Sequence, residues 1–171
     1  MYKQLKYFVI DVDGTMTDGG IYYDEHGNET KKFNTRDAAG FFAARLCDIK
    51  TIVLTGRRCV ATERRMKELK VDFVFQGVRD KAMFLKTFMQ ENKIVQGDIA
   101  YVGDDLNDLA PMKLVGFVAC PNDACEEIKE IATYVSTRKG GEGAVRDILE
   151  YVIRKREQWE ACVEKLYEVG K

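Results

Sequence analysis

The 171-residue sequence is poor in proline and histidine, carries almost no net charge and has no long hydrophobic run. With 2 Pro, 14 Gly and 11% aromatic residues, it lacks the composition of a disordered or low-complexity chain. The apolar run nearest the N-terminus, residues 7–10, is too short for a signal peptide or a membrane-spanning helix. A balance of 27 Lys+Arg against 28 Asp+Glu provides no basic surface for nucleic acid or an anionic membrane. We therefore expect a cytoplasmic protein that binds neither.

The cysteines are odd in number and show no C-x-x-C spacing. They are Cys47, Cys59, Cys120, Cys125 and Cys162. A disulfide scaffold or a zinc site needs paired, closely spaced thiols, so neither is expected. We expect reduced and mostly buried cysteines.

Apolar runs rich in β-branched and aromatic residues alternate with stretches of helical spacing. The expected strands are residues 7–12, 51–54, 72–75, 99–102 and 116–119. The expected helices are residues 38–46, 60–69, 82–91, 106–114 and 125–131. This alternation indicates a parallel sheet with helices on both faces, and burial on both faces explains why the strands are almost uniformly apolar. We expect one α/β domain over residues 1–171.

Two segments depart from the alternation. A turn-forming stretch between two short extended runs predicts a β-hairpin over about residues 19–34, inserted just after the first strand. After the glycine-rich residues 140–143, apolar residues at helical spacing predict a long helix from about Ala144. The pattern thins into the charged residues 154–157. The C-terminal helix and tail, about residues 144–171, are expected to be peripheral and could pack on another subunit.

The first acidic segment, Asp11-Val12-Asp13-Gly14-Thr15, directly follows the first expected strand. Side chains alternate in an extended chain, so Asp11 and Asp13 point the same way, at the edge where open α/β sheets bind ligands. Gly14 can adopt backbone angles closed to other residues and lets a ligand approach the backbone. The alternative interpretation is an ordinary Asp-Gly turn with solvated carboxylates.

The second acidic segment, Gly103-Asp104-Asp105-Leu106-Asn107-Asp108, follows the expected strand at residues 99–102. Helix capping is one interpretation of these residues. Two like charges about 4 Å apart, however, repel by roughly 4 kcal/mol at an effective dielectric constant near 20. Bringing both acidic segments into one crevice therefore requires a cation, and hard oxygen ligands suit Mg²⁺.

Two further groups follow the ends of other expected strands. Thr55-Gly56 brings a hydroxyl and a backbone N–H to the same sheet edge, and Lys81 brings an ammonium. Each of these two features is weak evidence for a functional site when taken alone, because Thr-Gly turns are common and lysines are usually solvated. Their placement after successive strands indicates one site.

Together, the motifs from Asp11 through Thr55 and Lys81 to Asp104 resemble the four-motif set of the haloacid dehalogenase superfamily phosphatases. The resemblance spans nearly the whole core. It implies a Rossmannoid three-layer sandwich and Mg²⁺-dependent hydrolysis of phosphomonoesters through an aspartyl-phosphate.

The same resemblance assigns a role to each matching residue. Asp11 would be the nucleophile and Asp13 the general acid/base, whose backbone carbonyl also binds Mg²⁺. Thr55 and Lys81 would hold the phosphoryl oxygens. The implied metal ligands are Asp11, Asp13 and Asp104, supported by Asp105 and Asp108.

Larger members of this superfamily insert a cap domain between these motifs. Here the segment from Thr15 to Thr55 holds only a short hairpin and one helix, and the segment from Thr55 to Lys81 holds one helix and one strand. We expect no cap domain. An open site discriminates poorly, so a neighbouring subunit is expected to supply the missing wall. The one histidine, His26, falls at the hairpin tip, is expected to be exposed and has no part in this chemistry.

Four local segments resemble more specifically the 3-deoxy-D-manno-octulosonate 8-phosphate phosphatases, which are uncapped tetramers of lipopolysaccharide sugar biosynthesis. These segments are residues 17–23, 32–37, 55–57 and 140–146. The resemblance implies this sugar-acid phosphate as substrate and a homotetramer built by the hairpins, with active sites at subunit interfaces. Thr15 stands where that family usually has valine, which leaves the chemistry unchanged.

Two alternatives stay open. One is the phosphatase of 2-keto-3-deoxynononate 9-phosphate, whose members tend to carry Glu after the Thr-Gly, where this chain has Arg57. A guanidinium can bind the substrate's carboxylate through two hydrogen bonds, although Arg57 also fits a solvated residue at a helix start. The other alternative is an inactive assembly module, which would have no need of the complete motif set.

Further residues are candidates for the substrate's carboxylate or phosphate. The expected substrate-binding residues are Thr35, Arg36, Gly56, Arg57, Arg65 and Arg146. Arg146 would act across a subunit boundary, whereas Arg64 and Arg65 also fit an exposed helix face. We expect Asp37 to cap the helix that follows it. Residues 140–143 are expected to form the entry turn of the last helix.

Overall fold

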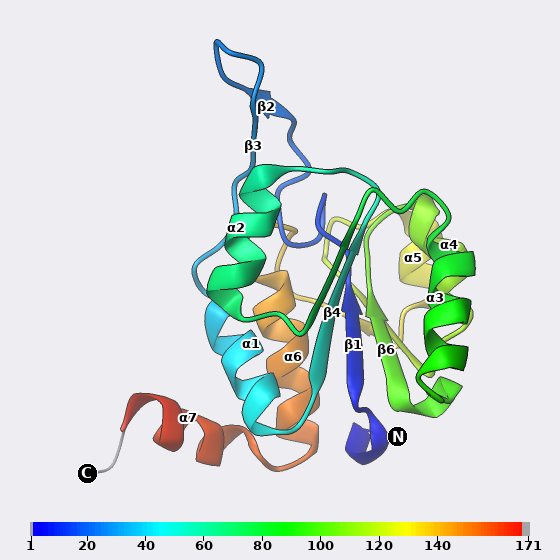
Figure 1. Cartoon of the computed structure of the whole chain (residues 1–171). Helices are drawn as coiled ribbons and strands as arrows, with labels where there is room; N and C mark the ends of the chain where they lie inside the picture. The colour runs from blue at the N-terminus through cyan, green and yellow to red at the C-terminus, as the bar shows by residue number, and fades with distance from the viewer. Residues whose placement is uncertain (1, 169–171) are drawn as a thin grey trace.

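A six-stranded parallel sheet forms the middle layer of the computed structural model, which describes residues 2–168 (Figure 1). Its order is β5-β4-β1-β6-β7-β8. The strands are β1 (Tyr7–Ile10), β4 (Lys50–Thr55), β5 (Phe73–Gln76), β6 (Ile99–Val102), β7 (Phe117–Cys120) and β8 (Tyr134–Val135). The five expected strands are confirmed. The edge strand β8 was not expected, because two residues are too few to show a pattern.

Helices cover both faces of this sheet (Figure 1). One face carries α1 (Asp37–Leu46), α2 (Val60–Leu69) and α6 (Ala144–Lys155), and the other carries α3 (Lys81–Glu91), α4 (Leu109–Met112) and α5 (Glu126–Ile131). The short 3-10 helices are η1 (Tyr2–Gln4), η2 (Gln96–Asp98) and η3 (Leu106–Asp108). The expected helices are confirmed, although the one at residues 106–114 is split between η3 and α4. The fold is the expected three-layer α/β sandwich.

Two hydrophobic cores fill the spaces between the sheet and its two helical layers. In β1, Phe8 and Ile10 face the core beneath α1 and α6, whereas Val9 faces the core beneath α3 and α5. All three side chains are fully buried. Alternating side chains of one strand therefore serve both layers, which is why the central strands are apolar throughout.

The expected hairpin projects beyond the C-terminal ends of the strands (Figure 1). Its strands, β2 (Tyr22–Tyr23) and β3 (Glu29–Thr30), are antiparallel. In the turn, the Asp24 carboxylate accepts hydrogen bonds from the backbone N–H groups of His26 and Asn28. Asp24 therefore closes the turn, and His26 is exposed as expected.

The C-terminal segment differs from the single long helix that was expected. Helix α6 ends at Lys155, Glu157 has a left-handed φ of 61°, and a second helix, α7 (Trp159–Tyr167), follows. Trp159 and Cys162 are buried against α1, because they belong to the core beneath that helix. Within the described residues, the tail thus packs on its own chain.

All five cysteines are free, and four of them are buried, as expected. The thiols of Cys47 and Cys162 lie 3.4 Å apart between α1 and α7. Burial raises the pKa of Cys47 to about 12, so this thiol stays protonated at neutral pH.

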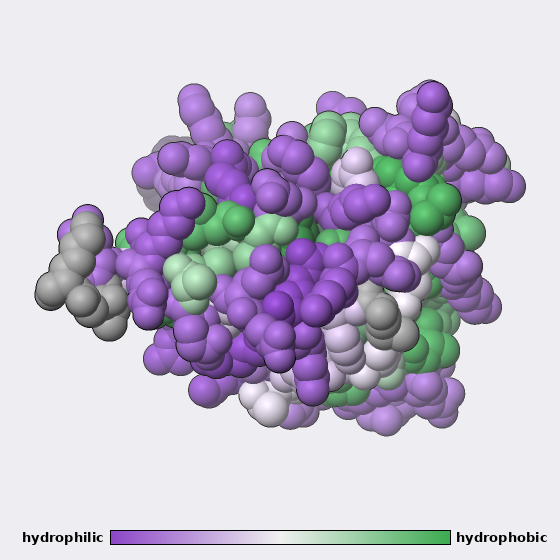
Figure 2. Space-filling view, turned by 90° about the horizontal axis from the view of Figure 1, so that it is seen from below, coloured by the Kyte–Doolittle hydropathy of each residue, from purple (hydrophilic) through white to green (hydrophobic). Residues whose placement is uncertain are grey.

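No cap domain interrupts the described chain, since only the hairpin and α1 lie between β1 and β4. Among residues 2–168, no helix has both the length and the hydrophobicity needed to cross a membrane. Viewed from the N-terminal ends of the strands, the described surface is mostly hydrophilic, with small separate hydrophobic areas (Figure 2).

Two contacts hold the start of α6 and the turn before it, one with the segment after β1 and one with α1. Gly140 packs so closely on the backbone of Gly14 and Thr17 that a Cβ atom there would overlap the Gly14 carbonyl oxygen. The Asp37 carboxylate accepts a hydrogen bond of 3.0 Å from the backbone N–H of Arg146, in the first turn of α6. The expectation that Asp37 caps its own helix is therefore wrong. It caps α6 instead, because the tertiary fold brings that helix start against α1.

We predict that Gly140→Ala destabilises the protein by about 1–3 kcal/mol, because the added methyl group meets rigid backbone atoms. Gly97→Ala is the matched control, since its Cβ would meet only the flexible end of the Gln4 side chain. Urea unfolding of both variants tests this. Equal stabilities for the two variants would contradict the proposed packing.

Candidate active site

A cavity of about 260 Å³ opens at the C-terminal ends of β1, β4 and β6. Its lining includes Asp11 and Asp13 after β1, Thr55 and Gly56 at the end of β4, and Asp104 after β6. In the sheet, β1 lies between β4 and β6, so the chain order reverses there. Open parallel sheets bind ligands at such a reversal point. The expected motifs from three strands therefore meet in one crevice.

A buried ion-pair cluster lies at the base of this crevice. Lys81, the first residue of α3, places its Nζ 2.9 Å from Asp11 Oδ1 and 2.7 Å from Asp108 Oδ1. Both carboxylates and the ammonium are nearly inaccessible to solvent. Burial alone would lower the pKa of Lys81, but the two carboxylates outweigh it and raise the pKa. Lys81 therefore holds a permanent positive charge beside Asp11.

Asp108 is held by three donors from its own chain. The Tyr101 hydroxyl donates to Oδ1 at 2.8 Å, Lys81 donates to the same oxygen, and the Asp104 backbone N–H donates to Oδ2 at 3.1 Å. Because its oxygens are already used, Asp108 is suited to holding Lys81 and the second acidic segment in place. Asp105, in contrast, is exposed and accepts a hydrogen bond from the Leu106 N–H, as a cap of η3.

The carboxylates of Asp11 and Asp104 are placed to hold a divalent metal ion, and Asp108, whose oxygens accept hydrogen bonds, lies beside them. One oxygen of each lies within 4.8 Å of the others. Thr15 donates to Asp104 Oδ1 at 2.8 Å, and the missing Cβ of Gly14 leaves space for Oδ2. All donors are hard oxygens, as Mg²⁺ prefers. The Asp13 side chain takes no part in this group.

The raised pKa values of Asp11 and Asp104 are also consistent with a cation site. Burial, together with the charge of Asp108, raises the pKa of Asp11 to about 8. Burial, with smaller contributions from Asp108 and Asp105, raises the pKa of Asp104 to about 7. The ionised forms are therefore unfavourable unless a cation offsets the concentrated negative charge.

Thr55 and Gly56 lie at the end of β4 and in the turn after it. Thr55 is buried, and its hydroxyl accepts a 3.4 Å hydrogen bond from the Arg57 backbone N–H. The Val78 N–H donates to the Thr55 carbonyl at 3.1 Å, which fixes the turn against the segment before α3. Thr55 and Gly56 thus face the crevice from a rigid strand end.

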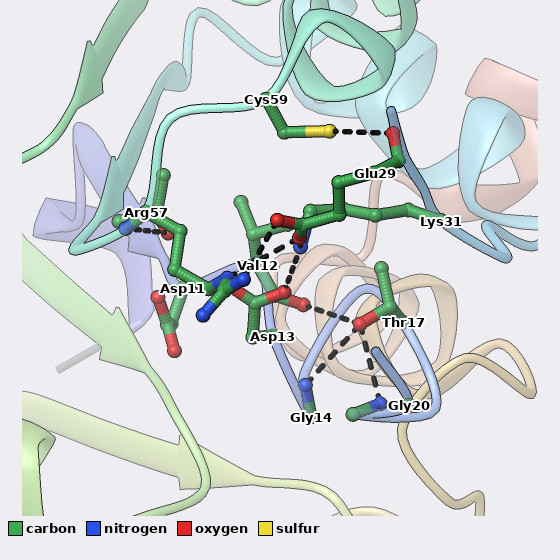
Figure 3. A network of polar contacts seen from close by, with 12 residues as sticks. Asp11, Val12, Asp13, Gly14, Thr17, Gly20, Glu29, Lys31, Arg57 and Cys59 are labelled. Carbon is green, nitrogen blue, oxygen red and sulfur yellow. Dashed lines mark hydrogen bonds and ion pairs between the residues drawn. The ribbon is translucent and has the colours of Figure 1, made fainter. Parts of the chain in front are cut away.

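A chain of four charged side chains runs along the hairpin side of the crevice (Figure 3). Lys31 contacts the carboxylates of Asp13 and, at 2.7 Å, Glu29. Glu29 in turn accepts two hydrogen bonds from Arg57, at 3.2 and 2.7 Å. The Arg57 and Lys31 bonds lower the pKa of Glu29 to about 2, and the two carboxylates raise the pKa of Lys31 against the effect of burial. Glu29, Lys31 and Arg57 are therefore charged at neutral pH.

The expected substrate-binding residues fall into two groups. Gly56 and Arg57 line the crevice, whereas Thr35, Arg36, Arg65 and Arg146 are not among its lining residues. Arg36 and Arg146 border a separate cavity of about 350 Å³. Arg65 donates to the Asn34 carbonyl, and Arg146 pairs with Glu150.

Three residues near the site, Tyr101, Glu29 and Lys31, were not predicted from the sequence. Tyr101 looks like any aromatic residue of a buried strand, and its hydroxyl partner is seven positions further on. Glu29 and Lys31 lie in an ordinary charged hairpin. Because they are two positions apart in an extended chain, their side chains lie on the same side, and this spacing was the only indication that they act together.

The comparisons with known proteins agree with this geometry. A family model described as haloacid dehalogenase-like hydrolase matches residues 73–149. The 3-deoxy-D-manno-octulosonate 8-phosphate phosphatase of Escherichia coli K12 is 34% identical over 88% of this chain and 80% of the enzyme. The enzyme of the same name from Yersinia pestis is 34% identical over 92% of this chain and 84% of the length of that enzyme.

Solved structures show the same fold. The 3-deoxy-D-manno-octulosonate 8-phosphate phosphatase of Moraxella catarrhalis, in complex with magnesium ion, phosphate ion and KDO, matches with a TM-score of 0.91 and 34% identity over 96% of this chain and 94% of that one. The cobalt-bound phosphatase of Haemophilus influenzae matches with a TM-score of 0.88 and 29% identity, covering 94% of each chain. Sequence identity along most of both chains and the shared uncapped fold lead to one conclusion: the chain belongs to the 3-deoxy-D-manno-octulosonate 8-phosphate phosphatase family of the haloacid dehalogenase-like hydrolases.

Proposed function

We propose that this protein hydrolyses 3-deoxy-D-manno-octulosonate 8-phosphate with Mg²⁺ as cofactor, in lipopolysaccharide sugar biosynthesis. The observation that carries the proposal is the meeting of Asp11, Asp104 and Lys81 at one strand edge, beside an open cavity. The relatives named above act on, or were crystallised with, the matching sugar acid. The nine-carbon alternative is not favoured, because these relatives carry the eight-carbon name.

The chemistry proceeds in two displacements at phosphorus. A carboxylate oxygen of Asp11 attacks, the bond between phosphorus and the sugar oxygen breaks, and Asp13 donates a proton to that oxygen. Asp13 then removes a proton from water, which attacks the aspartyl-phosphate and releases inorganic phosphate and free Asp11. Thr55 and Lys81 hold the phosphoryl oxygens. Mg²⁺, held by Asp11, Asp104 and the Asp13 carbonyl, would supply the charge that offsets the phosphate dianion.

Arg57 is the proposed partner of the substrate's carboxylate. It lines the cavity, and its guanidinium already binds one carboxylate, that of Glu29, through two hydrogen bonds. Glu29 uses the Nε and Nη2 groups of Arg57, so we expect the substrate's carboxylate to bind through the remaining N–H groups of the guanidinium. Gly56, beside it, offers backbone access to the phosphoryl group.

The remaining candidates would act between subunits. Thr35, Arg36, Arg65 and Arg146 do not line the crevice of their own chain, and we propose that they contact the substrate bound by a neighbouring chain. A cytoplasmic homotetramer is therefore part of the proposal. The exposed hairpin side chains support it, with Ile21 56% and Tyr23 64% accessible in the single chain.

We predict that Asp11→Asn lowers kcat by at least about a thousandfold, because an amide cannot form the aspartyl-phosphate. Phosphate release from eight- and nine-carbon keto-acid phosphates, with Mg²⁺ and with EDTA, measures this. Asp98→Asn, at the opposite end of the sheet, should keep full activity. An active Asp11→Asn protein would rule out Asp11 as nucleophile.

The raised carboxylate pKa values predict how stability depends on pH. Between about pH 4 and 8 the folded, metal-free protein binds protons on Asp11 and Asp104 that the unfolded chain has already released, so stability falls as pH rises. Mg²⁺ binds the ionised carboxylates, so its stabilising effect should be larger at pH 8 than at pH 6. Thermal unfolding with EDTA and with Mg²⁺ tests both trends. Asp104→Asn should weaken both pH trends. A stabilising effect of Mg²⁺ that is equal at pH 6 and pH 8 would contradict the assignment of these carboxylates as metal ligands.

We also predict that the double variant Ile21→Asp/Tyr23→Asp dissociates the tetramer, because two charges replace exposed apolar contacts of the hairpin. Multi-angle light scattering gives the mass. Val95→Asp is the control, as Val95 is 62% exposed at the far end of the sheet. A wild-type protein that is monomeric and fully active would refute this assembly.

A further inference from the structure

The hairpin delivers a buried ammonium to the side of the crevice. Lys31 follows β3 directly, and its side chain is 1% exposed although the hairpin around it is largely in solvent. A buried ammonium is unfavourable unless it is paired. The two partners of Lys31 are Asp13 and Glu29, so the burial of the lysine depends on these carboxylates (Figure 3).

The contact with Asp13 involves one carboxylate oxygen. Lys31 Nζ donates to Asp13 Oδ1. This leaves Oδ2 as the oxygen that can carry the proton in the proposed reaction. The Asp13 side chain is 28% exposed and lines the crevice, so it is accessible to a leaving group on one side and held by Lys31 on the other.

The Lys31 ammonium also has a second partner. Glu29 lies 2.7 Å from Nζ and is itself held by the guanidinium of Arg57. Lys31 therefore cannot swing away from Asp13 without breaking a second ion pair. The four charges connect the proposed carboxylate-binding arginine to the proposed general acid/base.

We propose that Lys31 is a positioning residue that holds the general acid/base Asp13 at the angle needed to protonate the leaving sugar oxygen. This inference rests on the proposed function. Lys31 contacts the side chain of Asp13 and not the backbone carbonyl proposed to bind Mg²⁺, so its effect on the reaction would pass through the Asp13 carboxyl group. Its contribution is geometric, since a general acid displaced by about 1 Å can lose on the order of a hundredfold in rate.

A comparison of leaving groups separates this role from simple structural support. The ratio kcat/KM reports only the steps up to departure of the leaving group. A sugar alkoxide needs a proton from Asp13, whereas 4-nitrophenolate leaves without one. A positioning role therefore affects 3-deoxy-D-manno-octulosonate 8-phosphate strongly and 4-nitrophenyl phosphate weakly, whereas damage to the fold affects both.

The variants are Lys31→Met, Lys31→Arg and the control Lys32→Met. Lys32 is the next residue, and its side chain is 63% exposed and pairs only loosely with Asp18 at 3.6 Å. We expect Lys31→Met to lower kcat/KM for the sugar-acid phosphate by about 10- to 100-fold and for 4-nitrophenyl phosphate by less than about threefold. Lys31→Arg should restore part of the loss, and Lys32→Met should match the wild type on both substrates.

Retained turnover of 4-nitrophenyl phosphate, with a thermal unfolding scan, shows that each variant is folded. An equal loss on both substrates, or no loss on the sugar-acid phosphate, would overturn the positioning role while leaving the proposed function intact. A wild-type protein that hydrolyses neither substrate would instead refute the proposed function itself, and with it the role of Lys31.

Discussion

The buried contact of Lys81 with Asp11 and Asp108 is the interaction on which the rest of the site depends. It joins the first residue of α3 to the ends of β1 and the segment after β6, three places far apart in the sequence. None of these charges is favourable without the others, because removing a partner would leave an uncompensated charge in a dry environment. Tyr101 and the Asp104 N–H complete the hydrogen bonds of Asp108, so the carboxylates beside Asp11 are held at fixed positions before any ligand arrives.

The hairpin and the turn before α6 support residues that line the open crevice above this cluster. A capless phosphatase has no domain to close over its substrate, and this chain compensates within one subunit in two ways. Gly140 packs against the backbone of Gly14, which fixes the segment that carries the acidic pair. Glu29 and Lys31 bring charges from β3 to the edge of the crevice, so the hairpin is part of the site and not only an attachment surface.

Much of the fold could be predicted from the sequence, because its signals are local. Each central strand is an apolar run buried on both faces, and each motif follows a strand end, so their meeting at one sheet edge follows from parallel topology. The predictions that proved wrong concern features that depend on contacts between distant parts of the sequence. Asp37 caps α6 because the tertiary fold places that helix start against it, and the C-terminal helix breaks near Glu157 so that Trp159 can reach the core beside α1.

By itself, the sequence determined the fold class, the position of both acidic segments after strand ends and the need for a cation beside them. Only the tertiary structure decided which partner each of these charges has. It paired Asp13 with Lys31 and Arg57 with Glu29, and it used Asp108 as a support for Lys81. The reason is physical: a motif records which groups follow a strand, whereas an ion pair depends on distances across the fold that no local spacing contains.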